Sequence, residues 1–346
     1  MTPNAIPKRQ VGRTELQITE LGFGAASLGN LYHPVSDDDA TATLQAALKG
    51  EFGYIDTAPR YGFGLSERRV GNVLRQNPGA VLSSKVGRLL RPDPGIKDDS
   101  EREGFRSPMP FREVFDYSYD AIMRSFEDSL QRLGLAHIDI LYIHDIGRLT
   151  HGDNDGFHFD ALTKGGGLRA LESLREAGAI NAFGVGVNEI EICQRVMDHA
   201  TLDVILLAGR YTLLEQGALD TLFPRCAKDG TSIVIGGAYN SGILATGVKG
   251  PGPHYYDYGA APTEIVSRVA AIERHCDRYD IALAAAALRF PLAHPIVASV
   301  IPGLGNKKRV QQTLDLYRTY IPNEFWQELR AEGLIVGSAP VPGATS

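Results

Sequence analysis

Short apolar runs alternate along this chain with longer amphipathic stretches. The short runs predict eight β-strands: residues 21–25, 52–56, 80–85, 138–144, 181–187, 203–207, 232–236 and 298–301. The longer stretches predict helices, because their apolar residues fall on one face; in 116–133, Ile122, Phe126 and Leu130 follow at four-residue spacing. Gly134 comes next, where a helix C-cap is expected.

The alternation indicates the fold class. Strand and helix alternating eight times predict parallel strands joined by helical crossovers. The 346 residues would suit about two generic domains, but a (β/α)8 TIM barrel takes roughly 250 residues and more with insertions. We therefore predict an α/β fold with one barrel domain over residues 1–346. Residues 10–20 predict a β-hairpin across the barrel floor.

Two segments interrupt the strand–helix repeat. Residues 89–115 are rich in Pro, Asp and Glu, and residues 151–167 contain His, Asp and a Gly triplet. Both follow predicted strands, so we expect long loops over the C-terminal mouth of the barrel. Long ordered loops at this position shape substrate sites.

Composition narrows the range of functions. Hydrophobic residues make up 43% of the chain and charged residues 22%, which suits a packed core. The net charge of −6 lacks the basic field of a nucleic-acid binder. No apolar run approaches the roughly 20 residues of a membrane span, and the N-terminal residues lack the apolar segment of a secretory signal. We therefore expect a cytoplasmic enzyme or binding protein that acts on a small molecule, without nucleic acid or membrane as a partner.

Metal and dinucleotide motifs are weak in this sequence. Cys193, Cys226 and Cys276 are scattered, which predicts neither a disulfide framework nor a zinc site. A G-x-G-x-x-A pattern at 165–170 lacks the preceding strand that a Rossmann site needs. Four side chains of segment 151–167 could bind a metal, but their spacing fits no zinc pattern or EF-hand. They are His151, Asp153, Asp155 and His158. We predict no metal site and interpret this segment as a solvated loop or a substrate lid.

Ionisable residues stand at the ends of three consecutive predicted strands. Asp56, Lys85 and His144 close the second, third and fourth strands, and Tyr61 follows Asp56 by five residues. A barrel keeps its active site at these strand ends, so we expect the four side chains to meet. Taken singly, each has a structural interpretation, such as a cap, an ion-pair partner or rim packing. Their convergence favours a catalytic site.

This residue set suits proton transfer beside a carbonyl or an alcohol. A free tyrosine loses its proton near pH ~10, and a neighbouring ammonium lowers that pKa. A carboxylate keeps the lysine charged, and a neutral imidazole can bond a substrate oxygen. Such a site suits hydride transfer in which a nicotinamide carries the redox step. Two alternatives stay open: a lyase that uses Lys85 as a Schiff base, and a nicotinamide-binding subunit without catalysis.

Four motifs in this chain resemble those of the aldo-keto reductases. They are GYIDTAPRYGFGLSE, SSKVG, SLQRLGLAHIDILYIHD and IPGLGNKKRVQQ, and the resemblance extends from about residue 11 to 320. It implies a catalytic tetrad of Asp56, Tyr61, Lys85 and His144. Tyr61 would be the general acid or base, Lys85 and Asp56 would lower its pKa, and His144 would orient the substrate oxygen. The family binds an extended nicotinamide dinucleotide over the barrel mouth.

Further segments resemble one group within this family. HDIGRLTHGD, LLAGRYTLLEQ, GGAYNSGILA and FPLAHPIVASVIPG are similar to the D-threo-aldose 1-dehydrogenase and L-fucose dehydrogenase group, and the pyridoxal 4-dehydrogenases are similar too. This implies NAD(P)-dependent oxidation of the C1 hemiacetal of an aldose, of the L-fucose, D-arabinose or L-galactose type, to a lactone. Oxidation of pyridoxal, or general reduction of aldehydes and ketones, is the alternative.

The resemblance also implies cofactor contacts. They fall on Asn188, Arg210, Tyr211, Asn240, Ser241, Gly242, Leu244, Arg309 and Gln312. Asn188 would bind the carboxamide, the turn 240–244 would meet the pyrophosphate, and the last two would meet the adenosine. Val187 replaces a family serine, which removes one expected hydrogen bond. Ala208 replaces a family glutamine, for which Arg210 or Tyr211 would compensate.

Cofactor preference and substrate contacts are predicted from single positions. Gly303 stands where NADP-preferring members often carry a cation, which favours NAD because one phosphate partner is missing. Lys307 and Lys308 lie close enough in sequence to weaken that inference. We further predict Tyr32, His33 and Arg148 as substrate contacts. The tyrosines of 255–258 would clasp the cofactor or pack on the surface.

Overall fold

Eight short parallel strands form one sheet in the computed structural model, which describes residues 5–343. In spatial order they are β16 (Val297–Val300), β13 (Ser232–Gly236), β12 (Val204–Ala208), β11 (Ala182–Val187), β10 (Ile140–His144), β5 (Val81–Val86), β4 (Tyr54–Asp56) and β3 (Phe23–Gly24). Backbone contacts join the first and last strands, because Gly22 N donates to Val300 O at 2.9 Å and Val300 N donates to Glu20 O at 2.8 Å. The predicted (β/α)8 barrel is confirmed, and each strand lies within three residues of its predicted position.

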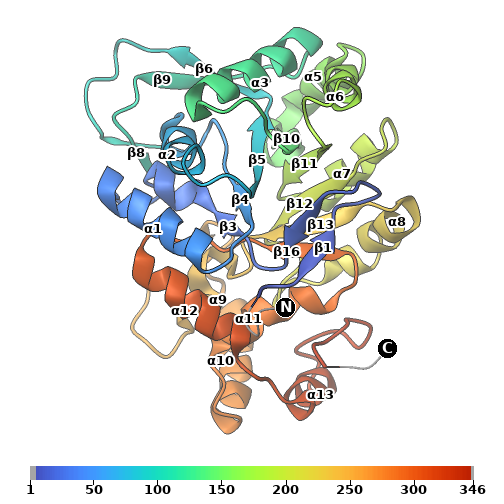
Figure 1. Ribbon diagram of the computed structural model, residues 1–346. Coiled ribbons are helices and arrows are strands. Elements are labelled where there is room, and N and C mark those ends of the chain that lie inside the picture. Colours follow the sequence, from blue (N-terminus) through green and yellow to red (C-terminus); the bar gives the residue numbers. More distant parts are fainter. Residues whose placement is uncertain (1–4, 344–346) are drawn as a thin grey trace.

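Helices surround the strands (Figure 1). They are α1 (Asp37–Lys49), α2 (Leu65–Leu74), α3 (Tyr119–Leu133), α6 (Gly167–Glu176), α7 (Ile190–Met197), α8 (Leu222–Asp229), α10 (Thr263–Arg278), α11 (Leu283–Arg289), α12 (Lys307–Arg318) and α13 (Asn323–Ala331). The predicted C-cap is confirmed at Gly134, which has φ 64° and donates its N–H to Leu130 O. Glycine adopts this left-handed conformation without a Cβ clash.

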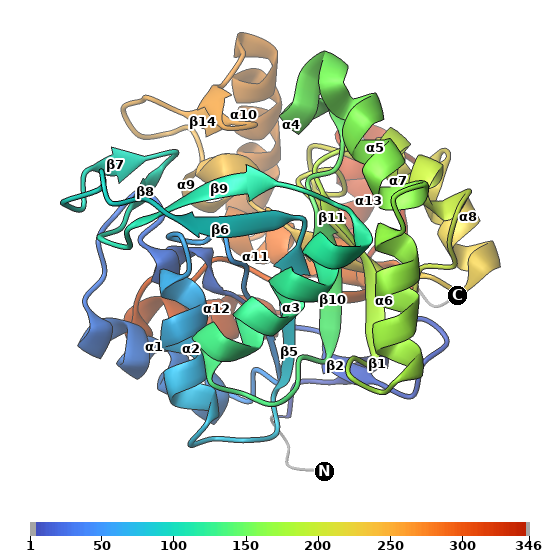
Figure 2. The same ribbon diagram turned by 90° about the horizontal axis from the view of Figure 1, so that it is seen from above.

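An antiparallel hairpin closes the floor of the barrel, as predicted. It consists of β1 (Lys8–Gln10) and β2 (Gln17–Thr19). Val11 and Ile18 are fully buried and pack with the interior side chains Tyr54, Ile140 and Val204. The hairpin lies at one end of the barrel, while α4 (Arg148–His151) and β14 (Tyr255–Tyr256) lie at the other (Figure 2). The hairpin therefore covers the end of the barrel opposite the C-terminal mouth.

Short hairpins edge this mouth. Segment 89–115 lies there as predicted, but it is largely paired: β6 (Arg88–Pro92) with β9 (Phe111–Phe115), and β7 (Glu101–Arg102) with β8 (Phe105–Arg106). A further hairpin pairs β14 with β15 (Gly259–Ala260). We call residues 249–261 the strap.

The prediction of a loop over 151–167 was wrong. The chain continues from α4 through a 3-10 turn (Gly152–Asn154) into α5 (Asp155–Thr163) and then α6. Phe159 and Leu162 supply the buried face of α5, a face too short for its period to be recognised among polar residues. Because α5 precedes Gly167, the G-x-G-x-x-A pattern has no strand before it.

The helices within residues 5–343 include none that is long and apolar enough to cross a membrane. Cys193, Cys226 and Cys276 are buried free thiols.

Candidate active site

The structure brings the predicted tetrad together at the barrel mouth. Asp56 is the last residue of β4, Lys85 lies one residue from the end of β5, and His144 is the last residue of β10. Tyr61 comes from the turn between β4 and α2. Tyr61, Lys85 and His144 line a cleft of about 520 Å³, which is a usual size for a small-molecule site.

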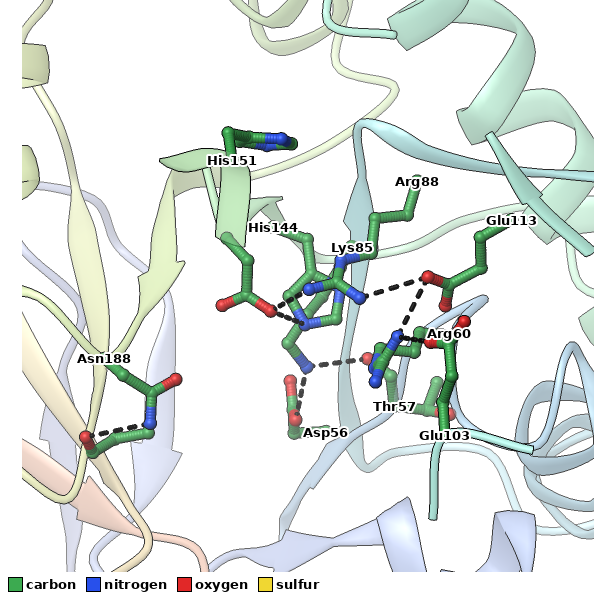
Figure 3. Close-up of polar contacts among 12 residues, drawn as sticks. Asp56, Thr57, Arg60, Lys85, Arg88, Glu103, Glu113, His144, His151 and Asn188 are labelled. Atoms are coloured by element: carbon green, nitrogen blue, oxygen red, sulfur yellow. Dashed lines mark hydrogen bonds and ion pairs between the residues drawn. The ribbon is translucent and has the colours of Figure 1, made fainter. Parts of the chain in front are cut away.

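Lys85 and Asp56 form a buried ion pair beneath this cleft (Figure 3). Lys85 Nζ donates to Asp56 Oδ2 at 2.6 Å and to the carbonyl oxygen of Thr57 at 3.0 Å. Ser83 Oγ donates to the other carboxylate oxygen at 2.7 Å. Each charged side chain is 2% exposed. Lys85 Nζ also lies 4.7 Å from the ring centroid of Tyr61, so the ammonium is held against the phenol.

Burial dominates the acidity of Tyr61. It raises the pKa of the phenol to about 12, and the attraction of the Lys85 ammonium for the phenolate offsets only part of this rise. The negative charge of Asp56 raises the pKa of Tyr61 as well. The resemblance implied that Lys85 and Asp56 both lower this pKa; the charge of Lys85 lowers it, whereas the charge of Asp56 raises it, because a carboxylate repels a phenolate.

Asp56 acts instead through Lys85. Burial pulls the pKa of Lys85 down, but attraction to Asp56 and then to Tyr61 outweighs it, so the net pKa is raised. Lys85 therefore stays a cation at neutral pH. The cation is available to stabilise a phenolate when Tyr61 gives up its proton.

His144 is neutral in this site. Burial lowers its pKa well below the usual value, and the nearby cations Arg88, Lys85 and Arg60 lower it further. Its ring lies edge-on to Tyr61, with 6.1 Å between the ring centroids. A neutral imidazole has one N–H donor and one acceptor nitrogen, so His144 can bond a substrate oxygen beside Tyr61.

An alternating chain of charges, which we call the charge chain, runs along one side of the cleft, and all its members except Glu113 line the cleft (Figure 3). Its members are Glu103, Arg60, Glu113, Arg88 and Asp145. Arg60 donates to Glu103 at 2.6 Å and to Glu113 at 2.9 Å. Arg88 lies 3.1 Å from Glu113 and also donates to Asp145.

Our sequence reasoning missed the charge chain. Arg60 directly precedes Tyr61, Asp145 directly follows His144, and Arg88 follows Lys85 by three residues. Proximity to the tetrad was thus a signal for three of its members. Glu103 and Glu113 arrive from the 89–115 segment, whose path the sequence did not reveal.

Two glycines position the turn that carries Tyr61. A Cβ on Gly29 would lie 2.5 Å from the carbonyl carbon of Tyr61, and a Cβ on Gly62 would lie 2.4 Å from the oxygen of Gly29. Gly62 also has φ +65°. The backbones approach so closely that only glycine fits on both sides.

Asn188 and Arg210 line the other side of the cleft. Asn188 Nδ2 contacts Ala208 O at 3.4 Å and Tyr258 Oη at 3.2 Å. Arg210 donates Nε to Asn188 O at 2.6 Å and forms two hydrogen bonds of 3.1 and 3.2 Å with Asp257. The strap thus reaches the cleft, and Tyr258 and Asp257 line it.

The 240–244 turn lies beside the strap. Ser241 Oγ accepts a hydrogen bond from Tyr258 N at 2.9 Å, while the N–H groups of Gly242 and Leu244 donate to Tyr239 O. The Asn240 side chain is buried and accepts from Thr212 Oγ1 at 2.6 Å. These contacts brace the turn, and its contact with a pyrophosphate stays a prediction.

The other predicted cofactor contacts do not line the cleft. Tyr211 is fully buried and packs against Phe223 and Phe290 rather than lining the cleft, and Leu244 is in the core as well. Arg309 is exposed on α12 with Gln312, and its charge lowers the pKa of the nearby Tyr239, although burial leaves that pKa raised. Arg309 therefore lies near the 240–244 turn.

The structure separates the three predicted substrate contacts. Tyr32 lines the cleft and is 55% exposed. Arg148 is 72% exposed and pairs with Asp153 at 2.8 Å. Neither Arg148 nor His33 is among the residues that line the cleft. Over the part of the chain that the structure describes, no group of three or more His, Cys, Asp or Glu side chains could hold a metal ion.

The sequence matches the aldo/keto reductase family over residues 20–332. The chain belongs to this family. It is 48% identical to a pyridoxal 4-dehydrogenase from Microbacterium luteolum, covering 96% of this chain and 98% of the relative. It is 39% identical to a D-threo-aldose 1-dehydrogenase from a Pseudomonas species, covering 92% and 95%.

Solved structures support the fold. An aldo-keto reductase from Bacillus halodurans, in its holo form, is similar with a TM-score of 0.73 and 24% identity, covering 97% of this chain and 98% of that one. A glycerol dehydrogenase from Gluconobacter oxydans has a TM-score of 0.71 and 21% identity over the full length of both chains. Aldo-keto reductases are oxidoreductases that use NAD(P)H and act on small molecules.

Proposed function

We propose that this protein oxidises a cyclic hemiacetal to a lactone, with Tyr61 as the general base. The hydroxyl on the hemiacetal carbon gives its proton to the Tyr61 phenolate, and hydride leaves the same carbon. A bound nicotinamide dinucleotide would accept that hydride. The single observation that carries this proposal is the buried Lys85–Asp56 pair held against the Tyr61 ring beside neutral His144.

Each residue of the tetrad has a distinct task in this proposal. Lys85 stabilises the phenolate that accepts the proton, and Asp56 keeps Lys85 charged. His144 donates a hydrogen bond to the reacting oxygen, which orients it toward Tyr61. The raised pKa of Lys85 disfavours the alternative of a Schiff-base lyase, because a nucleophilic amine must first lose its proton.

The donor groups along the mouth fit a nicotinamide dinucleotide. Asn188 offers an amide to the carboxamide, with Arg210 beside it in the cleft, and the cation Arg309 suits the adenosine end. Ser241 and Gly242 stand between them in sequence on the turn beside the strap. We propose that these residues hold NAD(P), and the absent cation at Gly303 favours NAD.

Two substrate classes carry a suitable hemiacetal. An aldopyranose of the L-fucose, D-arabinose or L-galactose type has several hydroxyls, which the carboxylates and guanidinium groups of the charge chain can bond. Pyridoxal forms an internal hemiacetal and also carries opposite charges on one ring. The 48% identity to the pyridoxal 4-dehydrogenase, against 39% to the aldose enzyme, favours this second substrate.

A substrate panel tests the proposal. Purified protein is mixed with NAD+ or NADP+ and with each of L-fucose, D-arabinose, L-galactose and pyridoxal, and the absorbance of the reduced nicotinamide is followed. Turnover with a lactone product supports the proposal, and the ranking of kcat/KM assigns the substrate and the cofactor. Absence of turnover on every hemiacetal, together with reduction of simple aldehydes, would overturn it. Tight cofactor binding with no turnover at all would favour a non-catalytic subunit.

A further inference from the structure

We infer that Asp145 is a positioning residue that holds His144 in the Nε2–H tautomer, so that His144 donates its hydrogen bond into the cleft. This inference rests on the proposed function. Asp145 is outside the tetrad, and its effect on the reaction would pass through His144.

The backbone brings Asp145 to the same cleft as its neighbour. Adjacent residues of an extended strand point to opposite faces, but β10 ends at His144, and Asp145 has φ 47°. Its N–H donates to Gly186 O at 3.0 Å, which anchors the bend. Asp145 and His144 consequently both line the cleft, and Asp145 Oδ2 lies 3.5 Å from His144 Nε2.

The contacts of the two ring nitrogens select the tautomer. Among the described residues, His144 Nδ1 is buried without a hydrogen-bond partner, so no acceptor favours a proton there. Nε2 faces a carboxylate, which only accepts hydrogen bonds when ionised. A proton on Nε2 is attracted to that oxygen, whereas a lone pair on Nε2 would be repelled. Protonation of both nitrogens is opposed by Arg88, Lys85 and Arg60.

The charge chain fixes the carboxylate in this position. Arg88 donates to the same oxygen, Asp145 Oδ2, that faces His144. Arg88 is itself held by Glu113, which also binds Arg60. The side chains of Arg88 and Glu113 are 6% and 5% exposed. Because an arginine fork gives directional hydrogen bonds, the chain locks the orientation of Asp145.

The length of the His144–Asp145 contact matters for the reaction. A separation of 3.5 Å is longer than the usual N–H···O hydrogen bond of 2.7–3.2 Å. The carboxylate therefore biases the position of the proton without consuming the donor. The N–H is left available to donate to a substrate oxygen, and that hydrogen bond shortens as the substrate binds.

Imidazole NMR tests the tautomer directly. In protein labelled with 15N-histidine, long-range 1H–15N correlations at neutral pH show which nitrogen of each ring carries the proton, and the His144→Gln variant identifies the His144 signals. We expect a protonated Nε2 and an unprotonated Nδ1. A proton on Nδ1 of the wild-type protein would overturn the inference. This measurement needs neither turnover nor a variant of Asp145, so it stands apart from the outcome of the substrate panel.

Asp145→Asn separates positioning from a merely structural role. Asparagine tolerates the left-handed conformation, but its amide can present either oxygen or nitrogen to Nε2, so the bias is lost. We expect a new population with the proton on Nδ1, and a kcat about tenfold to a hundredfold lower, since loss of a complete donor costs about 10²–10³. The KM for the nicotinamide cofactor should stay unchanged.

Asp153→Asn is the matched control, because this carboxylate is 94% exposed and pairs with Arg148 outside the cleft. It should leave the His144 spectrum and kcat unchanged. If Asp145→Asn keeps both the wild-type tautomer and the wild-type kcat, Asp145 has no positioning role.

Discussion

Replacing Tyr61 with phenylalanine removes the proposed proton acceptor and little else. The phenyl ring keeps its stacking with Phe105, whose centroid lies 6.3 Å away, and its position beside the Lys85 ammonium at 4.7 Å. The substitution removes the interaction of the phenol oxygen with Lys85 but keeps the Lys85 hydrogen bonds to Asp56 and Thr57. The substitution therefore isolates the chemistry of one hydroxyl.

The expected loss follows from the role of that hydroxyl. A positioned general base contributes about 10²–10⁴-fold to a rate, which corresponds to about 2.7–5.4 kcal/mol at 1.36 kcal/mol per factor of ten. We expect the Tyr61→Phe variant to lose kcat within this range. The Kd of the cofactor should stay unchanged, because the substitution does not alter Asn188 and Arg210, which we propose as cofactor contacts.

The absorbance of the reduced nicotinamide, followed during turnover, measures kcat, and fluorescence titration measures the Kd of the cofactor. Tyr320→Phe is the control, since it removes a hydroxyl from a tyrosine that is 83% exposed and does not line the cleft. If the Tyr61→Phe variant retains activity comparable to the wild type, the base is another group. An equal loss in both variants would show that the effect is not specific to the Tyr61 hydroxyl.

Three further predictions concern the same site. Because burial raises the pKa of Tyr61 to about 12 and oxidation needs the phenolate, kcat/KM for oxidation should rise with pH by about tenfold per unit between pH 7 and 10; a flat profile would contradict this. Lys85→Met leaves Asp56 buried without its partner, which should lower the free energy of unfolding, measured by urea melts, by about 3–5 kcal/mol. The same variant should move the pH profile of kcat/KM to more alkaline values, because the phenolate loses its neighbouring cation. Gly29→Ala places a methyl against the Tyr61 backbone and should reduce kcat with a stability loss of about 1–3 kcal/mol; Gly156→Ala, where the added Cβ meets nothing within 4 Å, should leave kcat unchanged.

The sequence predicted the barrel because its signals are local. The strand 232–236 was predicted to the residue, because a short apolar run between two turns has clearly marked ends. The site was predictable for a related reason. Asp56, Lys85 and His144 stand at the ends of strands, and parallel strands deliver their ends to one face of a barrel. Chain position alone was enough to bring these three together.

The charge chain on one side of the cleft could not be predicted by such reasoning. Glu113 meets both Arg60 and Arg88 only because β9 folds back on β6, and no local pattern encodes that pairing. Tyr211 was assigned to the cofactor from the resemblance, whereas packing places it in the core.

What the sequence determined by itself is thus the architecture and the identity of the residues that we propose for proton transfer. The tertiary structure decided the protonation state of those residues. Burial sets the pKa values of Tyr61 and His144, because the energy of a charge depends on the solvent and charges around it. Those surroundings come from segments far apart in the chain, and they exist only once the barrel has closed.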